Sequence, residues 1–144
     1  MHLQPETGFR ESYRILGETL ITVKDYTSGR HFEDAISYAF YPVDLHTRTG
    51  VRPKPLKRGT IPTVPLRALI PKGSENIIVA GRCVSSDRLA NSGLRVQAAC
   101  MGMGQAAGAT AALAAQSTST PLQVPLSKIH ELLQKHDAIV PMKA

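Results

Sequence analysis

The stretch from Asn76 to Ala115 constrains the fold of this chain more than any other. An apolar run, Ile77-Ile78-Val79-Ala80, stops at Gly81-Arg82, and a polar loop then leads into a segment built almost wholly of small residues. This order predicts a strand over 76–80, a loop, and a helix from about Leu94 to Ala115. Open α/β sheets bind ligands where a strand gives way to a helix, because the N-terminus of the helix leaves backbone N–H groups unpaired. The loop is therefore where we look first for a functional site.

The other elements that the sequence predicts are short. In chain order they are a bulged strand over 14–23, two helical turns over 24–38, a strand over 39–45 that ends at His46, a loop over 47–59, an irregular edge strand over 60–69 and an amphipathic closing helix over 125–136. Together they predict an α+β fold with two parts. Residues 1–72 hold mixed strands, and residues 73–144 hold the strand, the long helix and the closing helix.

Composition favours a folded globular protein, since 42% of the residues are hydrophobic and 19% are charged. The absence of Trp and the low aromatic content argue against a stacking platform for single-stranded nucleic acid. The net charge of +6 is concentrated between Asp44 and Glu75, where no acidic residue occurs. Prolines interleave the cations of this segment, so an extended loop that is solvated or binds a small anion is favoured over a nucleic-acid surface.

The two cysteines, Cys83 and Cys100, are too few for a disulfide scaffold and lack the spacing of a zinc site, so we expect free thiols. The five histidines are too scattered to predict a metal site. No secretion signal is visible near Met1. The localisation is unknown, with the cytoplasm as the default, because a signal on a missing N-terminal part would not be seen.

The long helix has two other interpretations. Gly104 and Gly108 form a small-xxx-small pair in a segment without charge, which is typical of a transmembrane contact face. A helix rich in Ala, with Gln97 and Gln105 inside it, fits close packing against a sheet better, so no membrane partner is expected. The run from Gly102 to Gly108 is also similar to a dinucleotide-binding fingerprint, but no strand precedes it. We interpret these glycines as positions where the backbone approaches another element or a flat ligand.

Several separate segments carry a resemblance to a known family. They are Gly81-Arg82-Cys83-Val84-Ser85-Ser86-Asp87-Arg88, Arg95-Val96-Gln97, Cys100 to Gly108, Gly8 to Gly17 with its Arg-Glu-Ser core, Tyr41-Pro42-Val43-Asp44-Leu45-His46, and Ile61 to Gly73. In this order they resemble the C-terminal part of FAD-dependent oxidoreductases distantly related to the fumarate reductase and succinate dehydrogenase flavoproteins. Tyr13 stands where that family usually has a second arginine, and Ser86-Asp87 where many members have Ser-His.

The resemblance implies that residues 1–72 belong to a substrate-facing cap domain and residues 73–144 to the C-terminal part of an FAD-binding α/β fold. Members of the family carry an N-terminal GxGxxG unit for the ADP half of FAD, and nothing of that kind precedes Met1. We therefore expect a C-terminal fragment that binds FAD weakly or not at all and lacks activity alone. The expected partners are a small-molecule substrate, a separate N-terminal half and further copies of this chain.

The cofactor-binding residues implied by the resemblance lie in the loop after the strand. They are Gly81, Arg82, Asn91, Ser92, Gly93, Leu94, Arg95 and Val96. Asn91-Ser92-Gly93 would cap the long helix, so that the N–H groups of residues 93–96 face the ligand. Arg95 would then lie at the flavin's pyrimidine edge, and the backbone at Gly81-Arg82 along its ribityl or pyrophosphate part. Without the resemblance, both arginines would be read as solvated or ion-paired surface residues.

The catalytic candidates are His46, Arg10 and Arg14. His46 lies next to Asp44 and could exchange a proton with a substrate, with an exposed or structural histidine as the alternative. Arg10 and Arg14 could bind a substrate carboxylate or the flavin edge, or they could pair with Glu11 and Glu18. Two other functions stay open. One is a non-enzymatic fragment that self-associates through the unpaired edges of the strand over 76–80, and the other is a small-anion binder that uses residues 48–72.

Overall fold

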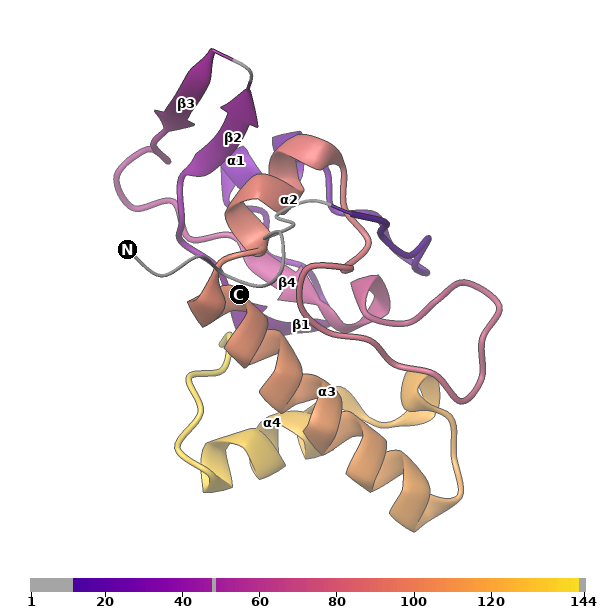
Figure 1. Ribbon diagram of the computed structural model, residues 1–144. Helices are drawn as coiled ribbons and strands as arrows, with labels where there is room; N and C mark the ends of the chain where they lie inside the picture. Colours follow the sequence, from indigo (N-terminus) through magenta and orange to yellow (C-terminus); the bar gives the residue numbers. More distant parts are fainter. Residues whose placement is uncertain (1–11, 48, 143–144) are drawn as a thin grey trace, which may run out of the picture.

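The computed structural model describes residues 12–47 and 49–142. It confirms the predicted α+β class, with helices and two small antiparallel sheets (Figure 1). The elements in chain order are α1 (Val23–Ser28), β1 (Ala35–Tyr38), β2 (Val43–Thr47), β3 (Gly50–Lys54), β4 (Thr63–Pro65), the 3-10 turn η1 (Leu66–Ala68), α2 (Arg88–Leu94), α3 (Gln97–Ser117), the 3-10 turn η2 (Pro121–Gln123) and α4 (Leu126–Lys135). Strand β1 pairs with β4, and β2 pairs with β3 in a hairpin.

The core of the C-terminal half forms where α3 and α4 pack on β1. Met103 and Ala106 of α3 are fully buried, as is Ile129 of α4. Small residues allow the close approach of α3, because a Cβ on Gly102 would lie 3.3 Å from Cβ of Ser37 in β1. The ring of His130 adds a polar tie, with Nε2 2.8 Å from the carbonyl oxygen of Ala35. Among the described residues, no helix is both long enough and apolar enough to cross a bilayer.

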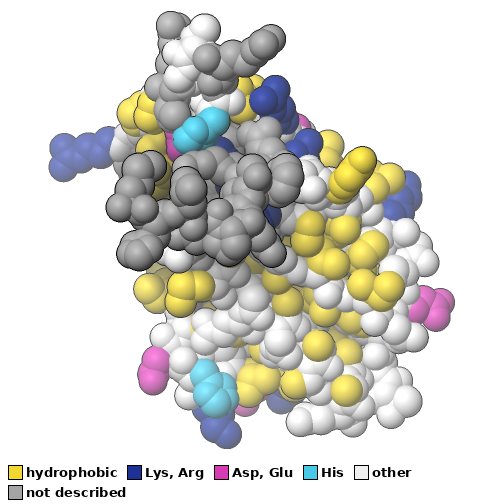
Figure 2. All heavy atoms as spheres, viewed as in Figure 1, with side chains coloured by type: hydrophobic (Ala, Val, Ile, Leu, Met, Phe, Trp, Pro, Cys, Tyr) yellow, Lys and Arg dark blue, Asp and Glu magenta, His cyan; other side chains and the backbone are white. Residues whose placement is uncertain are grey.

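The other two glycines of the predicted packing run have a different environment. A Cβ built on Gly104 or on Gly108 would meet nothing within 4 Å. Close approach to another element is therefore confirmed for Gly102 and is not found at Gly104 or Gly108, where the alternative of a flat ligand stays a prediction. Both line a hollow that Leu132 and Leu133 of α4 also line. Figure 2 shows apolar side chains on the side of the molecule from which α3 is seen in Figure 1.

The predicted strand over 76–80 does not form. The segment forms no strand ladder, although Ile78 and Ala80 pack against the core, and the N–H of Val79 donates a hydrogen bond of 2.8 Å to the carbonyl of Leu69. Ile77 is 55% exposed. An apolar run becomes a strand only when another strand pairs with it, and the described part of the chain places no strand beside this one.

The long helix predicted over 94–115 is present as α3, but the loop predicted before it contains a second helix, α2. Helix α2 ends at Leu94, and α3 starts at Gln97 after a break at Arg95-Val96. The second helical turn expected within 24–38 is instead strand β1, and the loop expected over 47–59 contains β3. Strand pairing overrides the local pattern in both places, since β1 pairs with the distant β4 and β3 pairs with the neighbouring β2. The helix expected at 125–136 is present as α4.

Candidate functional site

A cavity of about 330 Å³ lies at the N-terminus of α3. Its walls come from three places in the sequence: β2 with the residues before it, the turn after Ala80, and the junction between α2 and α3. The lining residues are Tyr41, Asp44, Arg82, Ser92, Arg95, Val96 and Gln97. The volume falls at the lower end of the range of small-molecule sites, which is roughly 300 to 1,000 Å³.

The N-terminus of α3 has no side-chain cap. Val96 occupies the N-cap position, and its apolar side chain accepts no hydrogen bond from the helix. The first bond within the helix runs from the N–H of Cys100 to the carbonyl of Val96, at 2.9 Å. The N–H groups of residues 97–99 therefore have no partner within the helix. This end of a long helix carries a partial positive charge, and no acidic residue in its first turn offsets that charge.

Arg95 joins the helix junction to β2. Its Nη2 donates a hydrogen bond of 3.0 Å to the carbonyl of Asp44, and the N–H of Asp44 donates one of 3.0 Å to the hydroxyl of Ser92. The Nε of Arg95 and the Oδ1 of Asp44 are both buried without a hydrogen-bond partner. A buried polar atom without a hydrogen-bond partner is costly. A ligand that offers an acceptor to Nε of Arg95 and a donor to Oδ1 of Asp44 therefore gains binding energy.

The turn that carries Arg82 is held from two sides. Gly81 has φ of +87°, a conformation that favours glycine, and the N–H of Val84 closes the turn on the carbonyl of Gly81 at 3.1 Å. The side-chain amide of Asn91 donates to the carbonyl of Arg82 at 3.1 Å and to the hydroxyl of Ser86 at 3.2 Å. These contacts fix the backbone that directs Arg82 toward the cavity.

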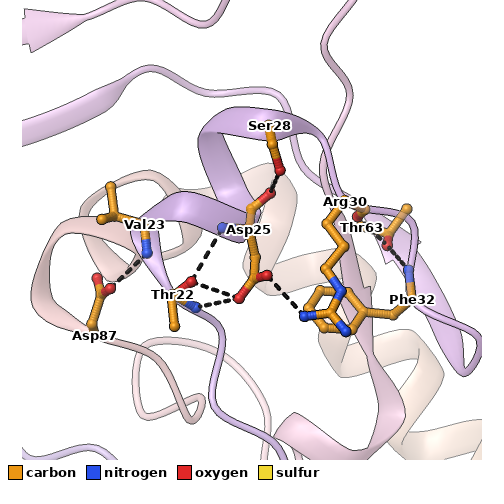
Figure 3. Close-up of polar contacts among 8 residues, drawn as sticks. All are labelled: Thr22, Val23, Asp25, Ser28, Arg30, Phe32, Thr63 and Asp87. Atoms are coloured by element: carbon orange, nitrogen blue, oxygen red, sulfur yellow. Dashed lines mark hydrogen bonds and ion pairs between the residues drawn. The ribbon is translucent and has the colours of Figure 1, made fainter.

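Asp87 fixes the position of α2, which forms the back of the cavity. One carboxylate oxygen accepts a hydrogen bond of 2.8 Å from the N–H of Ala90 and caps α2. The other accepts one of 2.6 Å from the N–H of Val23, at the start of α1 (Figure 3). One carboxylate thus serves the N-termini of two helices. This structural role accounts for an aspartate in the loop without any contact to a ligand.

Tyr26 of α1 secures the other side of α2. The ring lies so close to Gly93 that a Cβ there would be 2.6 Å from its Cζ atom, so a side chain at position 93 has no room. The hydroxyl donates a hydrogen bond of 2.8 Å to the carbonyl of Tyr41, which lines the cavity. Burial raises the pKa of this hydroxyl well above its ordinary value, and the hydrogen bond to Tyr41 opposes part of that rise. Tyr26 therefore stays a neutral donor.

His46 lies beside the cavity on β2. Its Nε2 is 3.5 Å from Oδ2 of Asp44, and its side chain is 34% exposed. Residues two apart on a strand share one face, so Asp44 and His46 project together from β2. The pair places an imidazole next to a carboxylate that lines the cavity.

The structure brings part of the predicted cofactor set to this cavity. Arg82, Ser92, Arg95 and Val96 line it, whereas Gly81 and Asn91 shape the turn next to it. Gly93 and Leu94 are buried in the core, with 0% of Leu94 exposed.

The predicted cap at Asn91-Ser92-Gly93 is wrong. These residues are buried inside α2, and the N–H of Arg95 already donates to the carbonyl of Asn91 at 2.9 Å. The sequence reasoning placed a loop where α2 lies and started the long helix at about Leu94 instead of Gln97, so the free N–H groups lie at residues 97–99 instead of 93–96. The signal for α2 was Asp87, an N-cap residue directly before Arg88-Leu89-Ala90.

Of the two arginines predicted to be catalytic, Arg14 lies within the described residues. Arg10 lies outside the described residues. Arg14 is half-buried, and the N–H of the next residue, Ile15, donates to the carbonyl of Cys83 at 2.9 Å. The segment that carries Arg14 therefore runs beside the Arg82 turn.

Sequence reasoning missed three residues that line the cavity, namely Tyr41, Asp44 as a lining group, and Gln97. Tyr41 and Asp44 belong to the Tyr-Pro element singled out above, which was the available signal. Two other hollows, of about 370 and 350 Å³, lie along α4. None of the buried polar atoms without a partner lies on their walls, so the cavity at α3 is the better candidate site.

Comparison with known protein families shows to which family the chain belongs. Residues 1–133 match the FAD dependent oxidoreductase family, which is most of the 144-residue sequence. The chain belongs to the FAD dependent oxidoreductase family. Comparisons with curated proteins and with solved structures find no match. The more distant relation to fumarate reductase flavoproteins stays a prediction.

For a member of the FAD dependent oxidoreductase family, the groups around the cavity suit an anionic or electron-rich part of FAD. The uncapped N-terminus of α3 offers N–H donors, and Arg95 offers a buried Nε that lacks a partner. Arg82 adds a second cation at the rim. Helix N-termini and arginines are the groups with which proteins bind phosphates and carbonyl oxygens. No group of three metal-ligating side chains occurs within the described ranges, 12–47 and 49–142.

Proposed function

We propose that this chain is the C-terminal part of an FAD-dependent oxidoreductase and that the cavity at α3 holds one electron-rich end of the cofactor. The observation that carries the proposal is the uncapped N-terminus of α3, in a cavity that also contains the unpartnered Nε of Arg95. Membership of the FAD dependent oxidoreductase family supports FAD as the ligand. The pyrimidine edge of the flavin, or a phosphate, supplies the acceptors that these donors lack.

When bound, FAD supplies the group that accepts or donates a hydride at flavin N5. The residues of this chain supply charge and position. The N–H groups of residues 97–99 and the guanidinium of Arg95 provide positive potential, which stabilises negative charge on a ligand ring. Asp44 faces Nε2 of His46, and an imidazole held beside the cavity in this way can exchange a proton with a small-molecule substrate.

The size of the cavity bears on affinity. FAD contains two ring systems joined by a pyrophosphate, and a cavity of about 330 Å³ encloses only one end of such a molecule. We therefore propose weak FAD binding and no turnover by this chain alone, with an N-terminal FAD-binding half as the partner that completes the site. Flavin that copurifies with the 144-residue chain at close to one equivalent would disprove this part of the proposal.

The binding site is tested by titrating the chain with FMN and with inorganic pyrophosphate while the backbone amides are followed by NMR. We expect saturable shifts of the amides of Gln97, Ala98 and Ala99. Arg82→Gln should weaken binding about tenfold, because a charge-assisted hydrogen bond contributes about 1.5 kcal/mol or more. Lys72→Gln removes the same charge from an exposed site away from the cavity and should leave the affinity unchanged. Shifts confined to other residues, or equal losses in both variants, would refute the site.

The small-anion alternative places binding in the segment from 48 to 72 instead. Two hydrogen bonds join the guanidinium of Arg67 to the carboxylate of Asp34, and they raise the pKa of that guanidinium, so this cation is already paired. The same titration separates the alternatives. A loss of pyrophosphate binding in Arg58→Gln but not in Arg82→Gln would favour the segment over the cavity.

Self-association also stays a prediction. Its first argument was an exposed sheet edge over 76–80, and the described structure has no strand there. What still favours it is the number of large apolar side chains on the surface, among them Phe40 at 66% and Met101 at 73% exposed. Light scattering on the purified chain decides the question, and a monomer at all concentrations would rule self-association out.

A further inference from the structure

The fold brings the two cysteines of the chain to the same turn. The Sγ of Cys83 is 3.6 Å from the carbonyl oxygen of Ala80. The Sγ of Cys100, in the first turn of α3, is 3.8 Å from the position that a Cβ on Gly81 would occupy. Ala80 and Gly81 are adjacent, so both thiols lie against one dipeptide. The missing side chain of Gly81 leaves the space through which Cys100 approaches.

The charges around Cys100 support this arrangement. Burial raises the pKa of the Cys100 thiol, Arg82 opposes that rise, and Cys83 adds to it. Both neighbours therefore interact electrostatically with Cys100. Both thiols are half-buried and free. No third metal-ligating side chain joins them in the part of the chain that the structure describes, so the pair lacks the ligand set of a structural zinc site.

We propose that Cys83 and Cys100 are a redox-active dithiol that low-molecular-weight disulfides convert to a reversible disulfide bond. Cys83 is the attacking thiol, because it lies in the short turn from 81 to 84, whereas Cys100 is held in a helix. Its thiolate attacks one sulfur of oxidised glutathione, and one glutathione thiolate leaves. The thiolate of Cys100 then attacks the sulfur of Cys83 and displaces the second glutathione. The protein loses two protons and two electrons, and one disulfide becomes two glutathione thiols.

The bond would connect the turn that carries Arg82 to the N-terminus of α3. Those are two of the three walls of the cavity described above. Oxidation would therefore fix the distance between Arg82 and the free N–H groups of residues 97–99. The disulfide itself does not depend on FAD binding, so its formation can be tested even if the proposed flavin site fails.

The test treats the full chain with oxidised glutathione under native conditions, alkylates the remaining thiols and maps tryptic peptides by mass spectrometry. Cleavage after Arg82, Arg88, Arg95 and Lys128 separates the two cysteines. We expect peptides 83–88 and 96–128 to be joined, the intact chain to lose about 2 Da, and dithiothreitol to reverse both changes. A chain that keeps two alkylatable thiols, carries two separate glutathione adducts or forms only linked dimers would overturn the proposal.

Single variants test the order of attack. Cys100→Ser should stop at a glutathione adduct on Cys83 that forms at the rate at which the native chain reacts. Cys83→Ser should form its adduct on Cys100 at least about tenfold more slowly, because Cys100 is held in α3 and its raised pKa leaves less of the reactive thiolate. If Cys83→Ser reacts as fast as the native chain, Cys83 is not the first nucleophile and the proposed sequence is wrong.

Discussion

The N-terminus of α1 is capped by side chains, whereas the N-terminus of α3 is not. At α1, Thr22 and Asp25 form a reciprocal capping box, and Asp87 from the distant α2 loop accepts the N–H of Val23 (Figure 3). At α3, the N-cap residue is Val96, which provides no cap. Helix α1 has 6 residues and α3 has 21. A helix as short as α1 is marginal without help, so its caps are a condition of its existence.

Helix α3 does not need such help. It is long, and it packs on β1 and α4 with Met103 and Ala106 fully buried. Its stability comes from packing, so its N-terminus can stay open at little cost. The difference teaches how to recognise a binding end of a helix in this molecule. Where carboxylates occupy the N–H groups, the helix end is structural, and where a long helix leaves them open beside arginines, it is available to a ligand.

The largest effect is expected from removal of the Asp87 carboxylate, which accepts hydrogen bonds at the N-termini of α1 and α2. Asp87→Ala should lower the free energy of unfolding by about 2 kcal/mol or more, since each lost cap costs roughly 1 kcal/mol. Asp87→Asn keeps an acceptor oxygen for one of the two N–H groups and should cost about half as much. Urea denaturation measures both. If Asp87→Ala unfolds at the same urea concentration as the native chain, the carboxylate does not support α1 and α2.

The capping box at α1 gives a smaller effect that depends on pH. Burial alone would raise the pKa of Asp25, but hydrogen bonds from Thr22 and Arg30, with the charge of Arg30, lower it below the ordinary 3.8. A folded-state pKa below the unfolded value means that the stabilisation is present above about pH 4 and is lost as the pH falls through the folded value. Asp25→Asn should therefore cost about 1 kcal/mol at pH 7.

The pH series provides the check on Asp25. The difference in unfolding free energy between Asp25→Asn and the native chain should shrink steadily below pH 4, as the native carboxyl becomes protonated. Glu131→Gln is the matched control, because its carboxylate forms only an exposed ion pair with Lys128 within one helix turn. A difference for Asp25→Asn that stays constant from pH 7 down to pH 2 would contradict the role of its charge.

Local signals in the sequence predicted some elements well. The apolar spacing of Leu126, Ile129 and Leu133 indicated α4, and α1 lies in the first half of the region assigned to two helical turns. The strand over 76–80 could not be judged locally, because a strand depends on a partner that may lie anywhere in the chain. Helix α2 was missed because its 7 residues, which include Asn91, Ser92 and Gly93, are too short and too polar to show an apolar period, although Asp87 offered an N-cap signal.

In the candidate site too, some residues could be predicted from the sequence and others are brought there by the fold. Arg82 and Arg95 were singled out from the sequence, and both line the cavity. Tyr41 and Asp44 reach it only because Ser92 and Arg95 bind the backbone of β2 across about fifty positions of sequence. The free helix end lies at residues 97–99 instead of the predicted 93–96, because residues 88–94 form α2, capped by Asp87, where the sequence predicted a loop.

The smallest predicted effect tests the comparison most directly, by giving α3 the cap that it lacks. Val96→Ser places a hydroxyl where it can accept from the N–H of residue 98 or 99 and should raise the unfolding free energy by about 0.5 to 1 kcal/mol. The same bond competes with a ligand, so affinity for pyrophosphate should fall severalfold. Val96→Asp adds a negative charge and should reduce affinity further while keeping the gain in stability.

The two readouts must move in opposite directions for the comparison to hold. A substitution that merely damaged the helix would lower stability and binding together, and one without contact to the site would change neither. Val96→Thr keeps the branched shape of valine and adds only the hydroxyl, so it separates the cap from the loss of apolar contact. If the capped variants gain stability but bind pyrophosphate as tightly as the native chain, the open end of α3 is not the binding site, and the contrast with α1 reflects packing alone.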